Sequence, residues 1–99
     1  MNANVGGGPV TVACAQTDPV LGDIDTNIDQ TELQIRSAAA QGANIVVLPE
    51  CASAGWAFKD REESGKYAET LEDGRTIRAW SALARELDIW VCGGFSEAA

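Results

Sequence analysis

Two short runs of β-branched and apolar residues, separated by a stretch with helical periodicity, place the strongest constraint on the fold of this chain. Residues 10–16 (Val-Thr-Val-Ala-Cys-Ala-Gln) and residues 45–48 (Ile-Val-Val-Leu) predict strands. Between them, apolar and small residues recur at spacings of three and four: Ile28, Thr31, Ile35, Ala38 and Ala39. A strand, a helix and a strand with short connections form a βαβ unit, whose two strands run parallel.

The remainder of the chain repeats this alternation. Asp25 or Thr26 predicts the start of the first helix and Gly42 its end. Residues 59–73 are mostly charged and predict an exposed connection with a helical turn near residues 62–68. A second amphipathic helix is expected after Asp73-Gly74, and residues 89–92 predict a third strand. The order β-α-β-α-β predicts an α/β fold with a mostly parallel sheet.

Length and charge limit the classes of protein that fit. Ninety-nine residues make one small domain, which we place at residues 10–99 after a flexible lead-in at residues 1–9. The net charge of −8 disfavours contact with nucleic acid or an anionic membrane surface. The sequence shows neither a signal peptide nor an apolar run long enough to span a bilayer, so we expect a cytoplasmic location.

The cysteines and the lack of histidine narrow the chemistry further. Cys14, Cys51 and Cys92 form an odd set without CxxC spacing, which predicts reduced, partly buried thiols; Cys14 and Cys92 are expected in the core. With no histidine, the chain cannot itself build a Ser-His-Asp or Cys-His site, and its spacings suggest no metal site.

Glu50 stands out because it follows the apolar run 45–48 and Pro49 directly. In open α/β sheets, ligands bind beyond the carboxyl ends of the strands. We expect Glu50 in a cleft at that edge, partly buried, where a carboxylate suits general-base catalysis. The alternative is a strand-end glutamate that caps a neighbouring loop or pairs with an arginine.

The residues after Glu50 offer two more candidates. Cys51 is a possible nucleophile, but in an extended segment its side chain points away from that of Glu50, which favours a structural role. Trp56 and Phe58 follow Gly55 and are candidates for the wall of a substrate pocket, although aromatic residues in such loops more often serve packing alone.

A resemblance to a known family covers residues 10–97. The stretch Val12-Ala-Cys-Ala-Gln-Thr-Asp18, then Asn27, then Gly42-Ala-Asn-Ile-Val-Val-Leu-Pro-Glu50 resembles the opening of the nitrilase superfamily of carbon–nitrogen hydrolases. Residues 80–87 followed by Ile89-Trp-Val-Cys-Gly-Gly-Phe-Ser-Glu97 resemble that family's second helix and third strand.

The resemblance implies the N-terminal part of an α-β-β-α sandwich and hydrolysis of a small linear amide, carbamoyl compound or nitrile by a Glu-Lys-Cys triad. Glu50 matches the family's glutamate, which acts as general base. The lysine and cysteine belong to motifs beyond the third strand that residues 1–99 do not contain, and Lys59 and Lys66 do not match the lysine motif. The loop 51–58 is more similar to amidases and carbamoylases than to nitrile-cleaving members.

The resemblance also implies that no metal or organic cofactor is used, and that full-length members form homo-oligomers. Because two triad residues are not in residues 1–99, we expect this segment alone to be inactive. A non-catalytic α/β binding or structural module is the alternative function, and it too is consistent with an incomplete triad.

Overall fold

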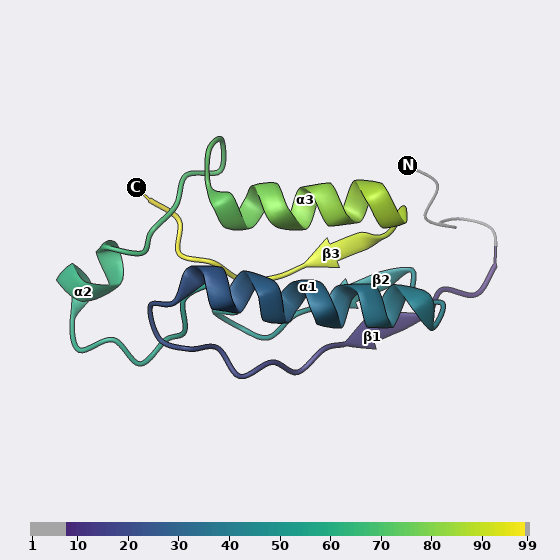
Figure 1. The fold of residues 1–99 in the computed structure, drawn as a ribbon, viewed down its shortest axis with the longest axis horizontal. Helices are drawn as coiled ribbons and strands as arrows, with labels where there is room; N and C mark the ends of the chain where they lie inside the picture. The colour runs from purple at the N-terminus through teal and green to yellow at the C-terminus, as the bar shows by residue number, and fades with distance from the viewer. Residues whose placement is uncertain (1–7, 99) are drawn as a thin grey trace.

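The computed structural model describes residues 8–98, so most of the expected lead-in at residues 1–9 lies outside the described residues. Its elements, in chain order, are β1 (Val12–Cys14), α1 (Ile24–Ala40), β2 (Ile45–Val47), α2 (Arg61–Gly65), α3 (Arg75–Leu87) and β3 (Trp90–Cys92) (Figure 1). The alternating α/β order expected from the sequence is confirmed, with the short helix α2 inserted in the charged connection.

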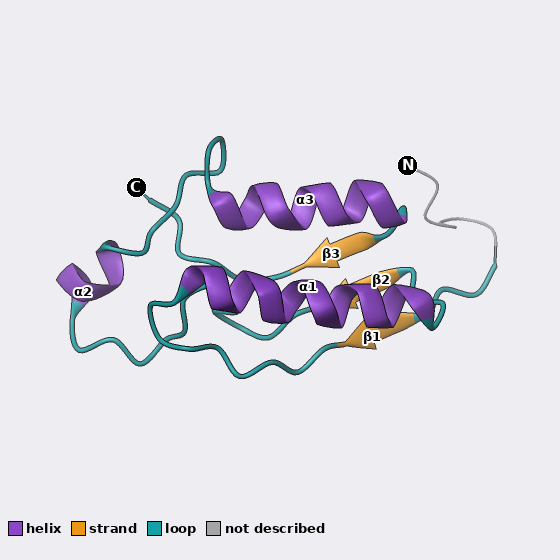
Figure 2. Ribbon diagram, in the orientation of Figure 1, coloured by secondary structure: helices purple, strands orange, loops and turns teal. Residues whose placement is uncertain are grey.

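The three strands form one parallel sheet in the order β1-β2-β3, so β2 is central (Figure 2). The register places Val12, Ile45 and Trp90 in one row across the sheet, and Cys14, Val47 and Cys92 in another. Because side chains alternate along a strand, these two rows point to the same face, and the row between them points to the other.

Helix α1 begins slightly earlier than the sequence predicted. Asp23, rather than Asp25 or Thr26, is the N-cap, and its Oδ1 accepts a hydrogen bond from the backbone N–H of Thr26 at 3.2 Å. The helix ends where expected, because Gly42 has a φ of 96°, a conformation that glycine adopts without the steric penalty of a side chain.

Helix α3 is capped from a distance. Its N-cap residue, Gly74, has no side chain, and the carboxylate of Glu69 takes over that role by accepting hydrogen bonds from the N–H and the hydroxyl of Thr76 at 2.8 and 2.5 Å. The backbone of Glu69 also bonds to Ser96 and Ala98 in the segment that follows β3. One residue therefore ties the start of α3 to the chain beyond the sheet.

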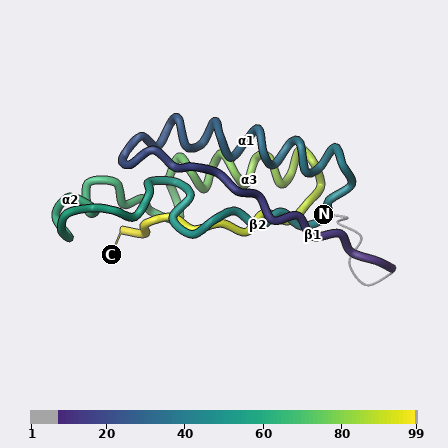
Figure 3. Tube along the Cα trace, turned by 90° about the horizontal axis from the view of Figure 1, so that it is seen from below, coloured from purple at the N-terminus to yellow at the C-terminus, as the bar shows by residue number. Residues whose placement is uncertain are grey.

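Helices α1 and α3 lie side by side on one face of the sheet (Figure 3). The core fills the space between these layers; its buried members are Ile35, Ala43, Val46, Leu48, Ala52, Trp80, Leu83 and Ile89. Val46, in the middle of the central strand, is fully buried, and Trp80 is a core residue, as its helical spacing predicted. No helix in residues 8–98 combines the length and apolarity needed to cross a membrane.

The opposite face of the sheet carries no helix among the described residues (Figure 3). Val12 and Trp90 are 54% and 47% exposed there, next to half-buried Ile45 and Val47. The expectation that Cys14 and Cys92 are core residues is wrong, because both thiols belong to this face and both residues are exposed. An apolar, β-branched strand does not reveal which of its two faces the helices cover.

We expect Gly93→Ala to destabilise the fold. A Cβ at position 93 would lie 2.7 Å from Cζ3 of the Trp80 ring and 3.0 Å from Cδ1 of Leu48, so the core would have to shift. Overpacking of this kind costs about 1–3 kcal/mol. A urea melt followed by tryptophan fluorescence measures the loss. Gly65→Ala is the matched control, since a Cβ there meets nothing within 4 Å; equal midpoints for the two variants would contradict the prediction.

We also expect the isolated 99-residue chain to self-associate through the open face of the sheet, because exposed apolar surface is worth about 25 cal/mol per Å² when it is buried. Light scattering at increasing concentration tests this. Trp90→Lys should shift the chain toward the monomer, whereas Leu33→Lys, at a 71% exposed position on α1, should not. A monomeric chain with a sharp cooperative thermal melt would be the opposite result.

Candidate functional site

Glu50 lies just beyond the carboxyl end of β2, the central strand. Sheet pairing continues past the strand itself: the N–H of Ala15 donates to the carbonyl of Val47 at 2.9 Å, and the N–H of Leu48 donates to that of Cys92 at 2.8 Å. Pro49 then ends the pairing, because it has no N–H to donate. Glu50 therefore occupies the position at which open parallel sheets bind their ligands.

The expected burial of Glu50 is wrong for the described residues, since Glu50 is exposed. The side chains of Glu50 and Trp56 are exposed, whereas residues 52–55 between them are buried. Glu50 lies in a shallow hollow of about 450 Å³ that it shares with Pro49 and Trp56. Within residues 8–98, its carboxylate has no hydrogen-bond or salt-bridge partner, so the structure provides no arginine partner of the kind considered above.

A compact turn follows Glu50 directly. Cys51 has a φ of 54°, a left-handed conformation that costs a non-glycine residue about 1–2 kcal/mol. The N–H of Gly55 donates back to the carbonyl of Cys51 at 2.9 Å and closes the turn, and residues 52–55 are buried. The segment is thus not extended, and the argument from extended geometry against Cys51 does not apply. We refer to residues 51–55 as the post-Glu50 turn.

Trp56 lies at the end of this turn and is 78% exposed. It lines the hollow around Glu50 and a second, smaller one of about 130 Å³ beside Pro19 and Leu21. Phe58 instead stacks on Tyr67, with ring centroids 5.5 Å apart and ring planes 20° apart. Of the two aromatic candidates, Trp56 is the one that the structure brings to Glu50.

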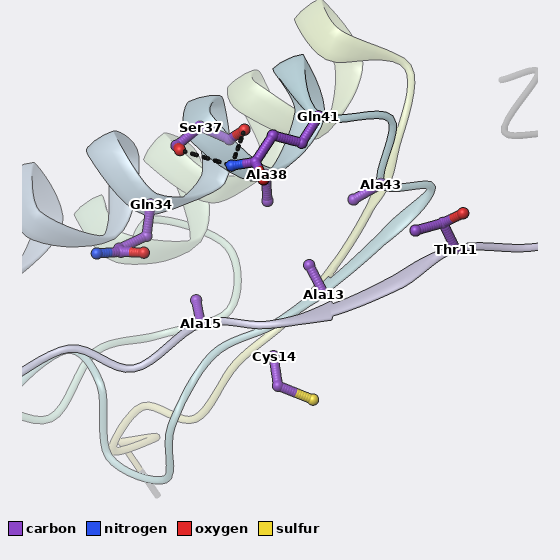
Figure 4. Close-up of a pocket in the computed structure, with 9 residues that line it drawn as sticks. All are labelled: Thr11, Ala13, Cys14, Ala15, Gln34, Ser37, Ala38, Gln41 and Ala43. Carbon is purple, nitrogen blue, oxygen red and sulfur yellow. Dashed lines mark hydrogen bonds between the residues drawn. The ribbon is translucent and has the colours of Figure 1, made fainter.

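A separate groove of about 290 Å³ runs between β1 and α1 (Figure 4). Figure 4 shows Ala13 and Ala15 facing the helix while the thiol of Cys14 points away from it. Glu50 does not line this groove. The residues that line the groove are Thr11, Ala13, Cys14, Ala15, Gln34, Ser37, Ala38, Gln41 and Ala43. Within residues 8–98, no group of three or more histidine, cysteine or acidic residues is arranged to hold a metal ion.

Asn27 is a buried polar residue near the site to which the sequence alone assigned no function. Asn27 is only 1% exposed, and its amide contacts the backbone of the post-Glu50 turn. The available signal was its spacing: Asn27 and Thr31 lie three and seven residues after Ile24, on the buried stripe of α1. Polar residues on such a stripe require hydrogen-bond partners, which marks them for attention.

Comparisons with known proteins agree with this architecture. The sequence pattern of the carbon-nitrogen hydrolase family matches residues 11–99. The chain is 34% identical over 88 residues to a nitrilase from Pyrococcus abyssi, a match that spans 89% of this chain and 34% of that protein. It is 35% identical over 79 residues to an N-carbamoylputrescine amidase from Arabidopsis thaliana, which covers 78% of this chain and 26% of the relative.

A solved structure shows the same fold. The C. elegans NitFhit protein aligns with 84% of this chain at a TM-score of 0.68 and 22% identity, over 20% of its own length. The chain thus spans about a third of the length of the Pyrococcus abyssi nitrilase, and less of the other proteins named here. Because the family pattern extends over nearly the whole chain, from the first strand to the end of the described residues, this chain belongs to the carbon-nitrogen hydrolase family.

Proposed function

We propose that Glu50 is the general base of a hydrolase that cleaves a carbon–nitrogen bond in a small linear amide, carbamoyl compound or nitrile. One observation carries the proposal: the carboxylate lies at the carboxyl end of the central strand, in a hollow, without a partner among the described residues. A salt bridge would occupy the carboxylate oxygens, whereas no described residue occupies those of Glu50.

The mechanism follows from the resemblance to the family. A cysteine thiol gives its proton to Glu50 and attacks the carbon of the amide or nitrile, and a lysine stabilises the charge that develops. From an amide, the amine leaves with the proton that Glu50 received, and a thioester remains; from a nitrile, the attack gives a thioimidate, which adds water and loses ammonia before the thioester forms. Glu50 then takes a proton from the water that hydrolyses the thioester and returns a proton to the cysteine sulfur as the acid leaves. The lysine and cysteine are supplied in this proposal from outside residues 1–99.

The hollow also bears on the substrate. Trp56 presents an exposed ring next to Glu50, which suits contact with an aliphatic chain or a planar amide. We place amides and carbamoyl compounds before nitriles because of the loop 51–58, and the Arabidopsis thaliana relative is an amidase by name. We further propose that the full-length protein is a cytoplasmic homo-oligomer and uses no organic or metal cofactor. Its net charge over residues 1–99 is −8, so we do not expect it to bind nucleic acid.

A chimaera tests the role of Glu50. Residues 11–99 would replace the matching segment of the Pyrococcus abyssi relative, and ammonia release would be measured on simple amides and nitriles. Glu50→Gln keeps the shape of the side chain but cannot take a proton, so kcat should fall by about 10²–10⁴-fold. Glu62→Gln, at an exposed position on α2, should leave kcat unchanged.

Near-normal turnover by Glu50→Gln, with a circular dichroism spectrum equal to that of the parent chimaera, would remove Glu50 from the mechanism. The 99-residue chain alone should release no ammonia. If it does, and Cys51→Ala abolishes the release, the thiol beside Glu50 is the nucleophile and the proposed origin of the triad is wrong.

Trp56→Ala should weaken substrate binding in the same chimaera. Loss of one aromatic wall removes about 1–2 kcal/mol of contact energy, so KM should rise roughly tenfold while kcat changes little. Leu33→Ala is the control, because Leu33 is exposed on α1 and lines neither hollow beside Trp56. Unchanged KM for substrates of increasing chain length would show that Trp56 does not contact the substrate.

A further inference from the structure

We infer that Asn27 is a positioning residue for Glu50: its buried amide fixes the backbone of the post-Glu50 turn and thereby the direction of the Glu50 carboxylate. The inference rests on the proposed function of Glu50. Asn27 does not touch Glu50 in the structure and acts through the main chain of Ser53.

The amide of Asn27 is saturated by three backbone groups. Its Oδ1 accepts from the N–H of Val20 at 2.7 Å, and its Nδ2 donates to the carbonyls of Val20 and Ser53, both at 2.8 Å. This set needs one acceptor and two donors on one short side chain, and asparagine provides them. Aspartate has the same size but no donor, so it would set two buried carbonyls against a carboxylate.

These bonds join two loops that are far apart in sequence. Val20 belongs to the loop before α1, and Ser53 is the middle residue of the post-Glu50 turn. The N–H of Gly22 donates to the carbonyl of Ala54 at 2.9 Å and also joins the two loops. The loops also touch closely, since a Cβ on Gly55 would lie 3.3 Å from the Cα of Leu21.

The turn is also in contact with the chain after β3. A Cβ on Gly94 would approach the backbone nitrogen of Cys51 to 3.0 Å, so the two main chains are in contact. The turn thus contacts both Gly94 and the loop that Asn27 anchors, and we refer to these two sets of contacts as the clamp. Cys51, immediately after Glu50, is held in its left-handed conformation by these contacts, because strained backbone persists only where its surroundings fix it.

The chain offers two matched controls. Gln30 also bonds to the loop before α1, through the N–H and the carbonyl of Asp18 at 3.2 and 3.1 Å, but no bond joins it to the post-Glu50 turn. Ser53 receives the bond from Asn27 on its carbonyl, while its buried hydroxyl has no partner among the described residues. Gln30→Ala and Ser53→Ala therefore leave the bond between the loops in place.

The experiment follows the Cys51 thiol. Because Cys51 is half-buried in the closed turn, a rise in its labelling rate reports opening of the turn without any need for catalysis. Cys14 and Cys92 are exposed and are replaced by serine in the whole chain, so a thiol reagent labels Cys51 alone. Asn27→Asp should raise the labelling rate at least about tenfold, because buried groups that lose their partners favour the opened state. Gln30→Ala and Ser53→Ala should change the labelling rate by less than about twofold. A urea melt of each variant gives its global stability, which separates local opening of the turn from global unfolding.

A second readout uses the chimaera defined above. Asn27→Asp should lower kcat by about tenfold or more with KM nearly unchanged, the signature of a misaligned base, and Gln30→Ala should not. Three results would each overturn the inference. The first is an equal Cys51 labelling rate in the Asn27 and Gln30 variants, and the second is a faster rate in Asn27→Asp that its loss of global stability fully explains. The third is a labelling rate in the parent chain as high as in concentrated urea. A different result separates the two claims. If Asn27→Asp raises the Cys51 labelling rate but the parent chimaera shows no hydrolase activity, Asn27 does hold the turn and the proposed function is wrong.

Discussion

The indole of Trp80, on α3, contacts both α1 and the chain at the end of β3. Its Nε1 donates to the hydroxyl of Thr31 at 2.9 Å, a buried bond between α3 and α1, and the Thr31 hydroxyl in turn donates a hydrogen bond to the carbonyl of Ile28 at 2.8 Å. The edge of the ring fills the space left by Gly93 at the end of β3. A buried indole N–H without a partner would be costly, so the two helices must keep their relative position for the ring to remain in the core.

The order of elements could be predicted from sequence because it depends on short periodicities. The spacing around Ile35 and Trp80 and the β-branched run at Ile45 are local signals, and each produced the expected element. The position of Glu50 at the sheet edge followed from the same local signal. Its exposure did not, because burial beyond the end of a strand depends on whatever lies over that edge, and no local pattern encodes a distant segment.

The misplaced thiols have a related cause. In a strand whose residues are apolar on both sides, the sequence does not state which side the helices cover, so the expectation that Cys14 and Cys92 are core residues fails. The role of Asn27 was hidden for another reason. Its partners are backbone atoms of Val20 and Ser53. Because almost every residue type carries the same backbone groups, the sequence at these positions does not reveal the bonds.

The register of the sheet has a consequence for the redox behaviour of the chain. Cys14 and Cys92 occupy the two outer strands of one row, with Val47 between them, so their Cα atoms lie about 9.6 Å apart, twice the spacing of neighbouring strands. A disulfide requires Cα atoms within about 7 Å, so these two cysteines cannot bridge each other while the sheet is intact. A disulfide at either thiol must therefore use a sulfur from elsewhere. In the self-associated chain expected above, oxidation of these exposed thiols between two copies would make the contact covalent, and a reducing agent would make it reversible again.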